Sequence, residues 1–381
     1  MERNIAIAIP SLGEAEWQAT KSCFESGWLT TGPKVREFEQ AFADYHQVNS
    51  AIATTSCTTG LHLMLAALNI GPGDEVIVPA FTWVSTANVV LYCGATPVFA
   101  DVDPQTYNIS AAEVANKLTD KTKAVIVVHL FGLCADMDAI KAILPDEVAL
   151  LEDAACASGA SYKGTFAGGL GDAAAFSFHP RKIITTGEGG MVTTQNSALA
   201  ERILCLRNHG ASISEEQRHH GPKPYILPEF GEVGFNYRMT DMQGAIGCVQ
   251  LSKLRGLVKQ RNEMADFYRQ QLSAIKGLFL PQSPECGGHS WQAYVTVVDP
   301  DTAVVARNDL MEQLQVRGIS TRPGTHAVHM LQVYRETFGL QPDDFPHAAM
   351  LNDQSLAIPL HNQMTQDDLQ YVVDTLTELM M

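Results

Sequence analysis

An acid and a lysine each stand just beyond an apolar run in the middle of the chain. Asp153 follows the run that ends at Glu152, and Lys182 follows the run Ala173–Phe178. Side chains at the ends of neighbouring parallel strands share one crevice, so we expect these two to meet. A lysine amine forms a Schiff base with an aldehyde, and a carboxylate keeps a pyridine nitrogen protonated. Pyridoxal phosphate (PLP) needs both groups, because its ring acts as an electron sink in amine chemistry.

Lys182 also precedes the glycine-rich turn TTGEGG, in which backbone can pass close to a ligand or to another chain. A reactive lysine must be partly neutral near pH 7, although its ordinary pKa is about 10.4. We expect burial and the neighbouring Arg181 to lower the pKa of Lys182. The alternative interpretation is a basic patch on a surface loop, made of His179, Arg181 and Lys182.

Two further segments suit a flat, phosphorylated cofactor. In TTSCTTGLHLML, the hydroxyls of Ser56, Thr58 and Thr59 stand where a strand gives way to a helix. Free N–H groups and the positive end of the helix dipole bind anions at such a junction. In VPAFTWVSTANVV, Trp83 follows a strand and could stack on a ring. Each residue also has an ordinary interpretation: the hydroxyls cap the helix, Trp83 is a core aromatic, and Asp153 caps a following helix.

Strand-length apolar runs alternate with helical patterns from about residue 50 to residue 195, which predicts a mostly parallel sheet with helices on both sides. Several runs are continuously apolar, as in strands that are buried on both faces. The expected strands are Ser50–Thr54, Glu75–Pro79, Thr96–Ala100, Ala124–His129, Ala149–Glu152, Ala173–Phe178 and Gly190–Thr194. The expected helices between them include Gly60–Leu68, Ser85–Cys93 and Asp136–Ile143.

The pattern changes after Asn236, where we expect two long helices over Met242–Leu257 and Lys259–Ile275. Shorter elements follow: a strand in Trp291–Val298, a helix around Asn308–Val316 and a terminal helix near Gln366–Leu379. A chain of 381 residues exceeds the size at which one core stops growing, so we expect two domains. We place the N-terminal segment and the large domain in residues 1–250, and a small C-terminal domain in residues 251–381.

Composition narrows the class of function. The net charge of −16 argues against a general nucleic-acid binder, but not against a phosphorylated small molecule, which needs only a few local donors. No apolar stretch approaches the roughly 20 residues that cross a bilayer, and the first residues do not read as a signal peptide. We therefore expect a cytoplasmic protein. Its eight cysteines are scattered without a CxxC pair, which favours free thiols over disulfides or a zinc site.

Seven segments together resemble one family of enzymes. In chain order they are SGWLTTGPKVREFEQAFADY, GDEVIVPAFTWVSTANVVLYCGATPVFADVD, VVHLFGLCADMDAI, LEDAACASGA, FSFHPRKIITTGEGGMV, GFNYRMTDMQGAIG and FPHAAMLNDQSLAIPLHNQMT. They span nearly the whole chain in the family's order, so no single motif carries the match. The chain is similar to the nucleotide-sugar aminotransferases of the DegT/StrS type, within the fold-type I PLP-dependent enzymes.

The resemblance implies a fold and a set of cofactor-binding residues. The fold is a large α/β domain with a mostly parallel sheet flanked by helices, plus a smaller C-terminal α/β domain. Lys182 would form the covalent link to PLP and move the proton during transfer. Asp153 would pair with the ring nitrogen, and Trp83 would stack on the ring. The residues that would hold the phosphate are Thr58, Ser177 and the backbone near Cys57.

The resemblance also implies a partner subunit and a substrate. Asn236 would reach the phosphate of the neighbouring subunit's cofactor, which predicts a homodimer. Thr31 and Gly32 lie where the family's N-terminal loop approaches the sugar. Arg322 and His326 stand in STRPGTHAVHM, where the family's sugar-recognition residues vary. Arg322 could clasp a substrate anion through two hydrogen bonds, or it could be an arginine at the end of a surface helix.

The reaction implied is transfer of an amino group from an amino acid, with L-glutamate as the expected donor, to a keto group of a nucleotide-linked deoxysugar. The chain departs from the family at Cys156, Cys57 and Leu133, where the family often has Gln or His, Gly, and Gln respectively. Two alternatives follow from the same family and fold. A sugar dehydratase would have histidine at the lysine position, and His179 lies nearby. A non-catalytic PLP-binding regulator is the other.

Overall fold

A seven-stranded sheet forms the centre of the structure, a computed structural model that describes residues 3–213, 225, 227–282 and 287–381. Its strands, in spatial order, are β1 (Ser50–Thr54), β10 (Gly190–Thr194), β9 (Ala173–Ser177), β6 (Ala149–Asp153), β5 (Thr122–Val128), β2 (Glu75–Pro79) and β4 (Thr96–Ala100). Neighbouring strands are parallel except where β10 pairs with β1 and β9. The predicted mostly parallel α/β sheet is confirmed.

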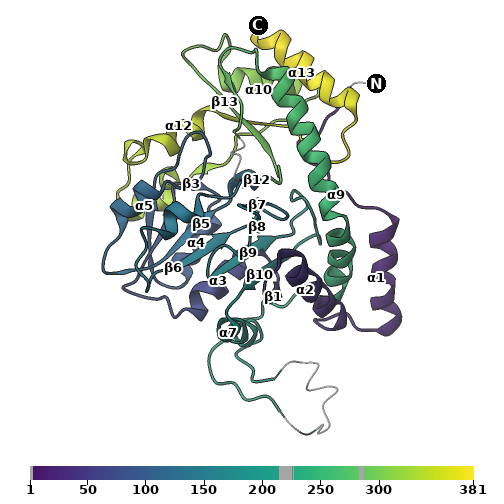
Figure 1. Cartoon of the computed structure of the whole chain (residues 1–381), viewed down its shortest axis with the longest axis vertical. Helices are drawn as coiled ribbons and strands as arrows, with labels where there is room; N and C mark the ends of the chain where they lie inside the picture. The colour runs from purple at the N-terminus through teal and green to yellow at the C-terminus, as the bar shows by residue number, and fades with distance from the viewer. Residues whose placement is uncertain (1–2, 214–224, 226, 283–286) are drawn as a thin grey trace.

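Helices and short strands surround this sheet and a smaller one (Figure 1). The α-helices are α1 (Glu14–Ser26), α2 (Pro33–His46), α3 (Cys57–Ala67), α4 (Ser85–Tyr92), α5 (Ala111–Lys117), α6 (Met137–Lys141), α7 (Ser197–Arg207), α9 (Asp241–Leu272), α10 (Arg307–Val316), α11 (Gln332–Phe338), α12 (Pro346–Gln354) and α13 (Gln366–Met380). The short strands are β3 (Phe81–Thr82), β7 (Ser161–Tyr162), β8 (Thr165–Phe166), β11 (Leu278–Phe279), β12 (Gly287–Gly288) and β14 (His326–Ala327).

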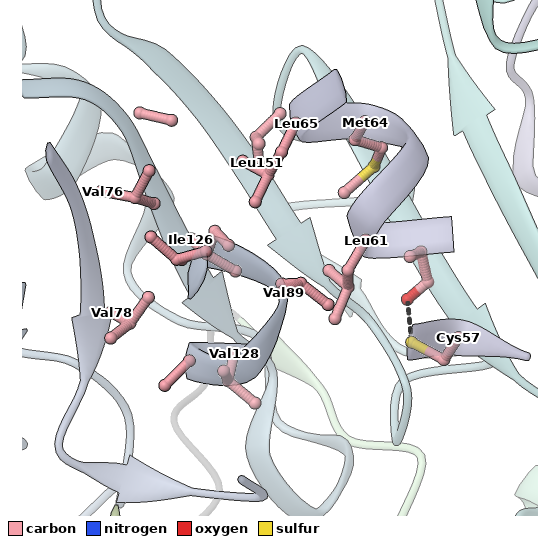
Figure 2. Packing of buried hydrophobic residues seen from close by; sticks show 14 of the residues in the cluster. Cys57, Leu61, Met64, Leu65, Val76, Val78, Val89, Ile126, Val128 and Leu151 are labelled. Atoms are coloured by element: carbon pink, nitrogen blue, oxygen red, sulfur yellow. Dashed lines mark hydrogen bonds between the residues drawn. The ribbon is translucent and has the colours of Figure 1, made fainter. Parts of the chain in front are cut away.

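Both faces of the large sheet are buried, because alternate side chains of each strand enter two different apolar clusters. In β5, Ile126 packs in one cluster with Leu61 of α3 and Val89 of α4 (Figure 2). The next residue, Val127, packs in the other cluster with Phe38 of α2. Burial on both faces explains why the residues of these strands form continuous apolar runs in the sequence.

A second, antiparallel sheet lies near the C-terminal end of the chain. It consists of β11, β13 (Tyr294–Val298) and β15 (Ser355–Ile358). Its buried side chains share a cluster with residues of α9, α10 and α13, including Tyr268, Leu310 and Leu376. This part of the fold therefore has an apolar core of its own.

The expectation of two helices between residues 242 and 275 is wrong, because the single helix α9 covers Asp241–Leu272. Gly256 lies in an open position, where a side chain would meet nothing, and one such glycine weakens a helix without ending it. Leu254, Leu257 and Met264 continue one buried face past that glycine. Helix α9 thus extends from α1 and α2 to α13 (Figure 1). It runs through the domain boundary placed between residues 250 and 251, which stays a prediction.

Within the residues that the structure describes, no helix is both long and apolar enough to cross a membrane. The cytoplasmic location stays a prediction. The cysteines at positions 23, 57, 93, 134, 156, 205 and 248 are free thiols, and Cys286 lies outside the described residues. The described residues contain no group of three or more His, Cys, Asp or Glu side chains that could hold a metal ion.

Candidate active site

Strand register brings the sequence-predicted residues to one edge of the large sheet. Thr54, the last residue of β1, pairs with Gly190, and Gly190 pairs with Ser177 at the end of β9. Asp153 ends β6 and pairs with Val128, the last residue of β5. The carboxyl ends of these parallel strands therefore meet, as expected for a ligand site in an open α/β sheet.

Asp153 is almost completely buried and is held by neutral donors. Its Oδ2 atom accepts a hydrogen bond from Thr86 Oγ1 at 2.8 Å. Its Oδ1 atom accepts one from the Ala155 backbone N–H at 3.1 Å and lies 3.7 Å from Cys57 Sγ. No lysine, arginine or histidine forms an ion pair with Asp153 in the described chain. A buried carboxylate that has no cationic partner is suited to bind a positively charged group of a ligand.

The neighbouring acid, Glu152, has a structural role instead. It is fully buried and accepts hydrogen bonds from His129 Nε2 and from the backbone N–H groups of Gly168, Leu170 and Gly171, at 2.7 to 2.8 Å. Burial has the largest effect on the Glu152 pKa and raises it, but these hydrogen bonds together lower that pKa below its ordinary value. Glu152 therefore fixes the loop that precedes β9, on the opposite face of β6 from Asp153.

Lys182 lies in the loop after β9, where its Nζ atom donates a hydrogen bond to Cys156 Sγ at 3.1 Å. Burial has the largest effect on the Lys182 pKa and lowers it. The contact with Cys156 and, after it, the proximity of Cys57 and Asp153 outweigh burial and raise the Lys182 pKa above its ordinary value. Burial thus lowers the Lys182 pKa as expected, but the expected net lowering is wrong for the protein without cofactor.

The start of α3 offers backbone donors to an anion. Ser56 caps this helix, since its Oγ accepts the Thr59 N–H at 3.1 Å. The N–H groups of Cys57 and Thr58 have no acceptor among the described residues. Gly190 allows this arrangement, because a Cβ there would come within 2.6 Å of the Cys57 backbone nitrogen. The glycine-rich turn thus brings β10 against the helix start, within one chain.

The remaining predicted phosphate and ring residues lie around this edge. Ser177 is buried, and its Oγ accepts the His179 backbone N–H at 3.5 Å. Trp83 follows β3 and is 53% exposed, so it is not a core aromatic. Its ring centroid lies 5.5 Å from that of His326, because β3 pairs with β14. The structure therefore brings together two residues that the sequence places 243 positions apart, the predicted ring-stacking and sugar-recognition side chains.

Positive charge gathers beside Lys182. Burial lowers the pKa of His179 most strongly; the charges of Arg181, Lys182 and Arg322 lower it further, while the charge of Glu188 raises it. Burial and the charge of Arg181 also lower the pKa of Arg322. Arg322 does not end a helix, contrary to the alternative interpretation, because its backbone pairs with Ala357 of β15. The arrangement can attract an anionic part of a substrate.

Thr31 and Gly32 pack against the start of α9. Thr31 Oγ1 donates to the Met239 carbonyl, and a Cβ on Gly32 would overlap the Trp28 indole. Asp241 holds the same loop through its backbone N–H, which donates to the carbonyls of residues 29 and 30. In the described chain, no hydrogen bond joins Thr31 or Gly32 to the lysine or to the acid of the site. Their predicted role toward the sugar stays a prediction.

Asn236 is exposed, and its backbone pairs with that of Asn208. The following residue, Tyr237, accepts the Thr55 backbone N–H at 3.0 Å, so this segment lies beside the end of β1 and the start of α3. Within the described chain, the Asn236 side chain has no hydrogen-bond partner. An exposed amide next to this edge is compatible with the predicted contact to another subunit, which stays a prediction.

Sequence reasoning missed Thr86 and the contact made by Cys156. Thr86 lies in the first turn of α4, and its Oγ1 is also 3.1 Å from Thr82 Oγ1. Nothing in the sequence singles out Thr86, because Thr82 lies in β3 and Thr86 in α4, so their spacing is not that of a helical pair. Nothing in the sequence pairs Cys156 with the lysine, because the two belong to different loops.

The residues at this edge fit PLP. A buried carboxylate without a cation, a lysine amine and free helix N–H groups supply partners for a ring nitrogen, an aldehyde and a phosphate. A separate small hollow, lined by Tyr107, Phe131 and His289 among others, contains none of the predicted site residues. The chemistry therefore points to the strand edge rather than to that hollow.

Comparison with known proteins gives the family. The DegT/DnrJ/EryC1/StrS aminotransferase family matches residues 10–377. The spore coat polysaccharide biosynthesis protein SpsC of Bacillus subtilis (strain 168) is 39% identical over 374 residues, 98% of this chain and 96% of SpsC. A Streptococcus pneumoniae protein solved in its PLP form has a TM-score of 0.91 at 27% identity, covering 99% of this chain and 98% of that one. DesI, solved in the presence of its TDP-sugar product, has a TM-score of 0.88 at 30% identity, covering 99% and 93%.

The family match covers nearly the whole chain, and the strand edge carries the groups that PLP needs. This chain therefore belongs to the DegT/DnrJ/EryC1/StrS aminotransferase family and is a PLP-dependent aminotransferase.

Proposed function

We propose that this aminotransferase moves an amino group from an amino acid, with L-glutamate as the expected donor, to a keto group of a nucleotide-linked deoxysugar. The observation that carries the proposal is the convergence of a buried carboxylate and a lysine amine at one strand edge, with cations beside them. DesI supports the sugar class, since its structure was solved with a TDP-sugar product. SpsC supports it too, through its name as a polysaccharide biosynthesis protein.

Lys182 and Asp153 would be the two catalytic residues. When bound, PLP supplies an electron sink that stabilises negative charge at the substrate carbon. Asp153 would hold a proton on the ring nitrogen, oriented by the hydrogen bond from Thr86. Lys182 would hold the cofactor and then, as a free amine, use Nζ to take the proton from the donor's α-carbon. In the second half-reaction the same atom would deliver a proton to the sugar carbon.

Other residues of the edge would bind rather than react. The N–H groups of Cys57 and Thr58, with Ser177, would hold the phosphate of PLP at the start of α3. Trp83 would cover the ring. Arg322, together with Arg181, would bind an anionic group of the substrate, either the donor carboxylate or the sugar-nucleotide diphosphate. His326 would approach the sugar from beside Trp83.

Thr86 gives a test of how the acid is oriented. We expect Thr86→Val, which removes the hydroxyl but keeps the side-chain size, to lower kcat/KM. A hydrogen bond to a charged group contributes about 1.5–3 kcal/mol, so we expect a loss of roughly 10- to 100-fold. Thr86→Ser keeps the hydroxyl and should retain most activity. Equal kcat/KM for Thr86→Val and the unmutated enzyme, measured under steady-state conditions, would show that Thr86 does not orient Asp153.

Asn236 gives a test of the proposed homodimer. If it completes the site of the neighbouring subunit, Lys182→Ala and Asn236→Ala chains that are each impaired should restore activity when mixed and allowed to exchange. Each mixed dimer would contain one site with both residues intact, so we expect recovery toward about a quarter of normal activity from random pairing. Activity that stays at the level of the separate variants, despite subunit exchange shown by mass spectrometry, would place Asn236 in its own subunit's site.

A substrate panel tests the whole proposal. Purified enzyme is incubated with L-glutamate and nucleotide-linked 3-keto and 4-keto sugars, and products are identified by mass spectrometry. We expect one keto sugar to gain an amino group while 2-oxoglutarate forms in equal amount. Loss of water from the sugar without amine transfer would instead support the dehydratase. Binding of PLP without turnover of any substrate would support the regulator.

A further inference from the structure

The partner of the Lys182 amine is a thiol. Lys182 Nζ donates to Cys156 Sγ at 3.1 Å, and this is its one hydrogen bond within the described residues. Both side chains are partly exposed, so the contact does not lie in the apolar core. A lysine side chain has four rotatable bonds and loses rotamer entropy when it is fixed, so a hydrogen-bond partner matters for where its amine lies.

The position of Cys156 is itself fixed by the turn that follows β6. The Ala155 N–H donates to Asp153 Oδ1 at 3.1 Å, and the Ala157 N–H donates to the Ala154 carbonyl at 2.9 Å. Ser290 Oγ donates to the Cys156 carbonyl at 3.3 Å from outside the turn. One turn therefore places both the acid of the site and the sulfur that contacts the amine.

The other thiol of the site, Cys57, is engaged differently. Its buried side chain lies in the apolar cluster that contains Leu61 (Figure 2). Its Sγ donates to the Ala175 carbonyl at 3.3 Å and lies 3.7 Å from Asp153 Oδ1. Burial, and then the charge of Asp153, raise the pKa of Cys57, which keeps it a neutral donor. Cys156 is thus the thiol of the two that is available to the lysine.

We propose that Cys156 is a positioning residue for Lys182, holding the free amine whenever that lysine is not joined to the cofactor. The inference rests on the proposed role of Lys182. A thiol sulfur is a weak hydrogen-bond acceptor, so it binds Nζ less strongly than a carboxylate would. The amine therefore stays able to rejoin the cofactor. Because the contact favours the ammonium form, it also governs how much of the amine is neutral at a given pH.

The first test measures Lys182 itself in the full-length protein freed of PLP. The probe is acetic anhydride, which labels neutral amines, and peptide mass spectrometry follows the labelling rate of Lys182 between pH 7 and pH 10. Since Cys156 raises the pKa of Lys182, we expect Cys156→Ala to label several-fold faster than the unmutated protein near pH 8. Cys156→Ser keeps an acceptor and should bring the rate back toward normal. Cys57, Asp153 and His179, the other titratable groups near the amine, are unchanged.

A matched control separates this effect from loss of any cysteine. Cys205, in α7, is also a partly exposed free thiol and is not among the groups that shift the Lys182 pKa, so Cys205→Ser should leave the Lys182 labelling rate unchanged. In steady-state assays, Cys156→Ala should lower kcat several-fold at unchanged KM for the donor, with partial recovery in Cys156→Ser. A structural defect alone would not move the Lys182 labelling profile in this direction.

A reciprocal measurement needs no change at Cys156. Iodoacetamide reacts with thiolates, and a positive charge beside a thiol speeds that reaction. We expect Cys156 to be alkylated several-fold faster in PLP-free protein than in Lys182→Met, because only the former has an amine beside the sulfur. Equal Cys156 rates in these two proteins, or equal Lys182 labelling in Cys156→Ala and unmutated protein, would overturn the inference. Neither result bears on which lysine carries PLP, so the proposed function would stand or fall separately.

Discussion

Lys182→Ala should stop multiple turnover. The variant loses the amine that holds the cofactor and the only base proposed for proton transfer, so we expect the rate to fall by at least about 10³-fold. The visible absorption of the lysine-linked cofactor should be absent as well, so adding glutamate should cause no bleaching. Absorption spectra and steady-state assays of purified protein measure both effects.

A surface lysine provides the control for this variant. Lys141 is exposed at the end of α6, and Lys141→Ala should keep normal spectra and activity, because such surface changes shift stability by less than about 0.5 kcal/mol. Full transamination by Lys182→Ala, with the mutation verified by mass spectrometry, would remove Lys182 from its assigned role.

Asp153→Ala should give the second-largest loss. A buried carboxylate aimed at a charge in the reaction is a preorganised electrostatic group, and removing such groups costs about 10²- to 10⁴-fold in rate. We expect kcat to fall within that range while the circular dichroism spectrum stays that of the folded protein. The ring nitrogen would lose the charge that keeps it protonated.

Asp153→Asn separates charge from shape. Asparagine can still accept the hydrogen bond from Thr86, but it carries no negative charge, so its kcat should be nearly as low as that of Asp153→Ala. Normal turnover by Asp153→Asn would show that the charge is dispensable. Normal turnover by Asp153→Ala would remove the acid from the mechanism altogether.

The large sheet could be predicted well from the sequence. The strands of this sheet are buried on both faces and therefore consist of continuous apolar runs. The predicted ranges Ser50–Thr54, Glu75–Pro79 and Gly190–Thr194 match β1, β2 and β10. Asp153 and Lys182 were found because each follows such a run. Helix α9 was divided wrongly, because a single helix can continue through an exposed glycine when its buried face continues.

Contacts between distant loops could not be predicted from the sequence. Thr86 reaches Asp153 only because α4 packs beside the end of β6, and Cys156 reaches Lys182 only because two loops meet at the strand edge. The predicted direction of the Lys182 pKa shift is wrong for the same reason. Its direction depends on which groups surround the amine, and the sequence showed Arg181 but not the thiol. Side-chain partners across loops are properties of tertiary packing rather than of local pattern.

The central claim is that Lys182 carries the cofactor. Reduction of the PLP-loaded enzyme with borohydride fixes the cofactor to its lysine, and peptide mass spectrometry then identifies that residue. The account predicts the added mass on the peptide that contains Lys182, and its loss when glutamate is added before reduction. Labelling of a different lysine at full stoichiometry would contradict it.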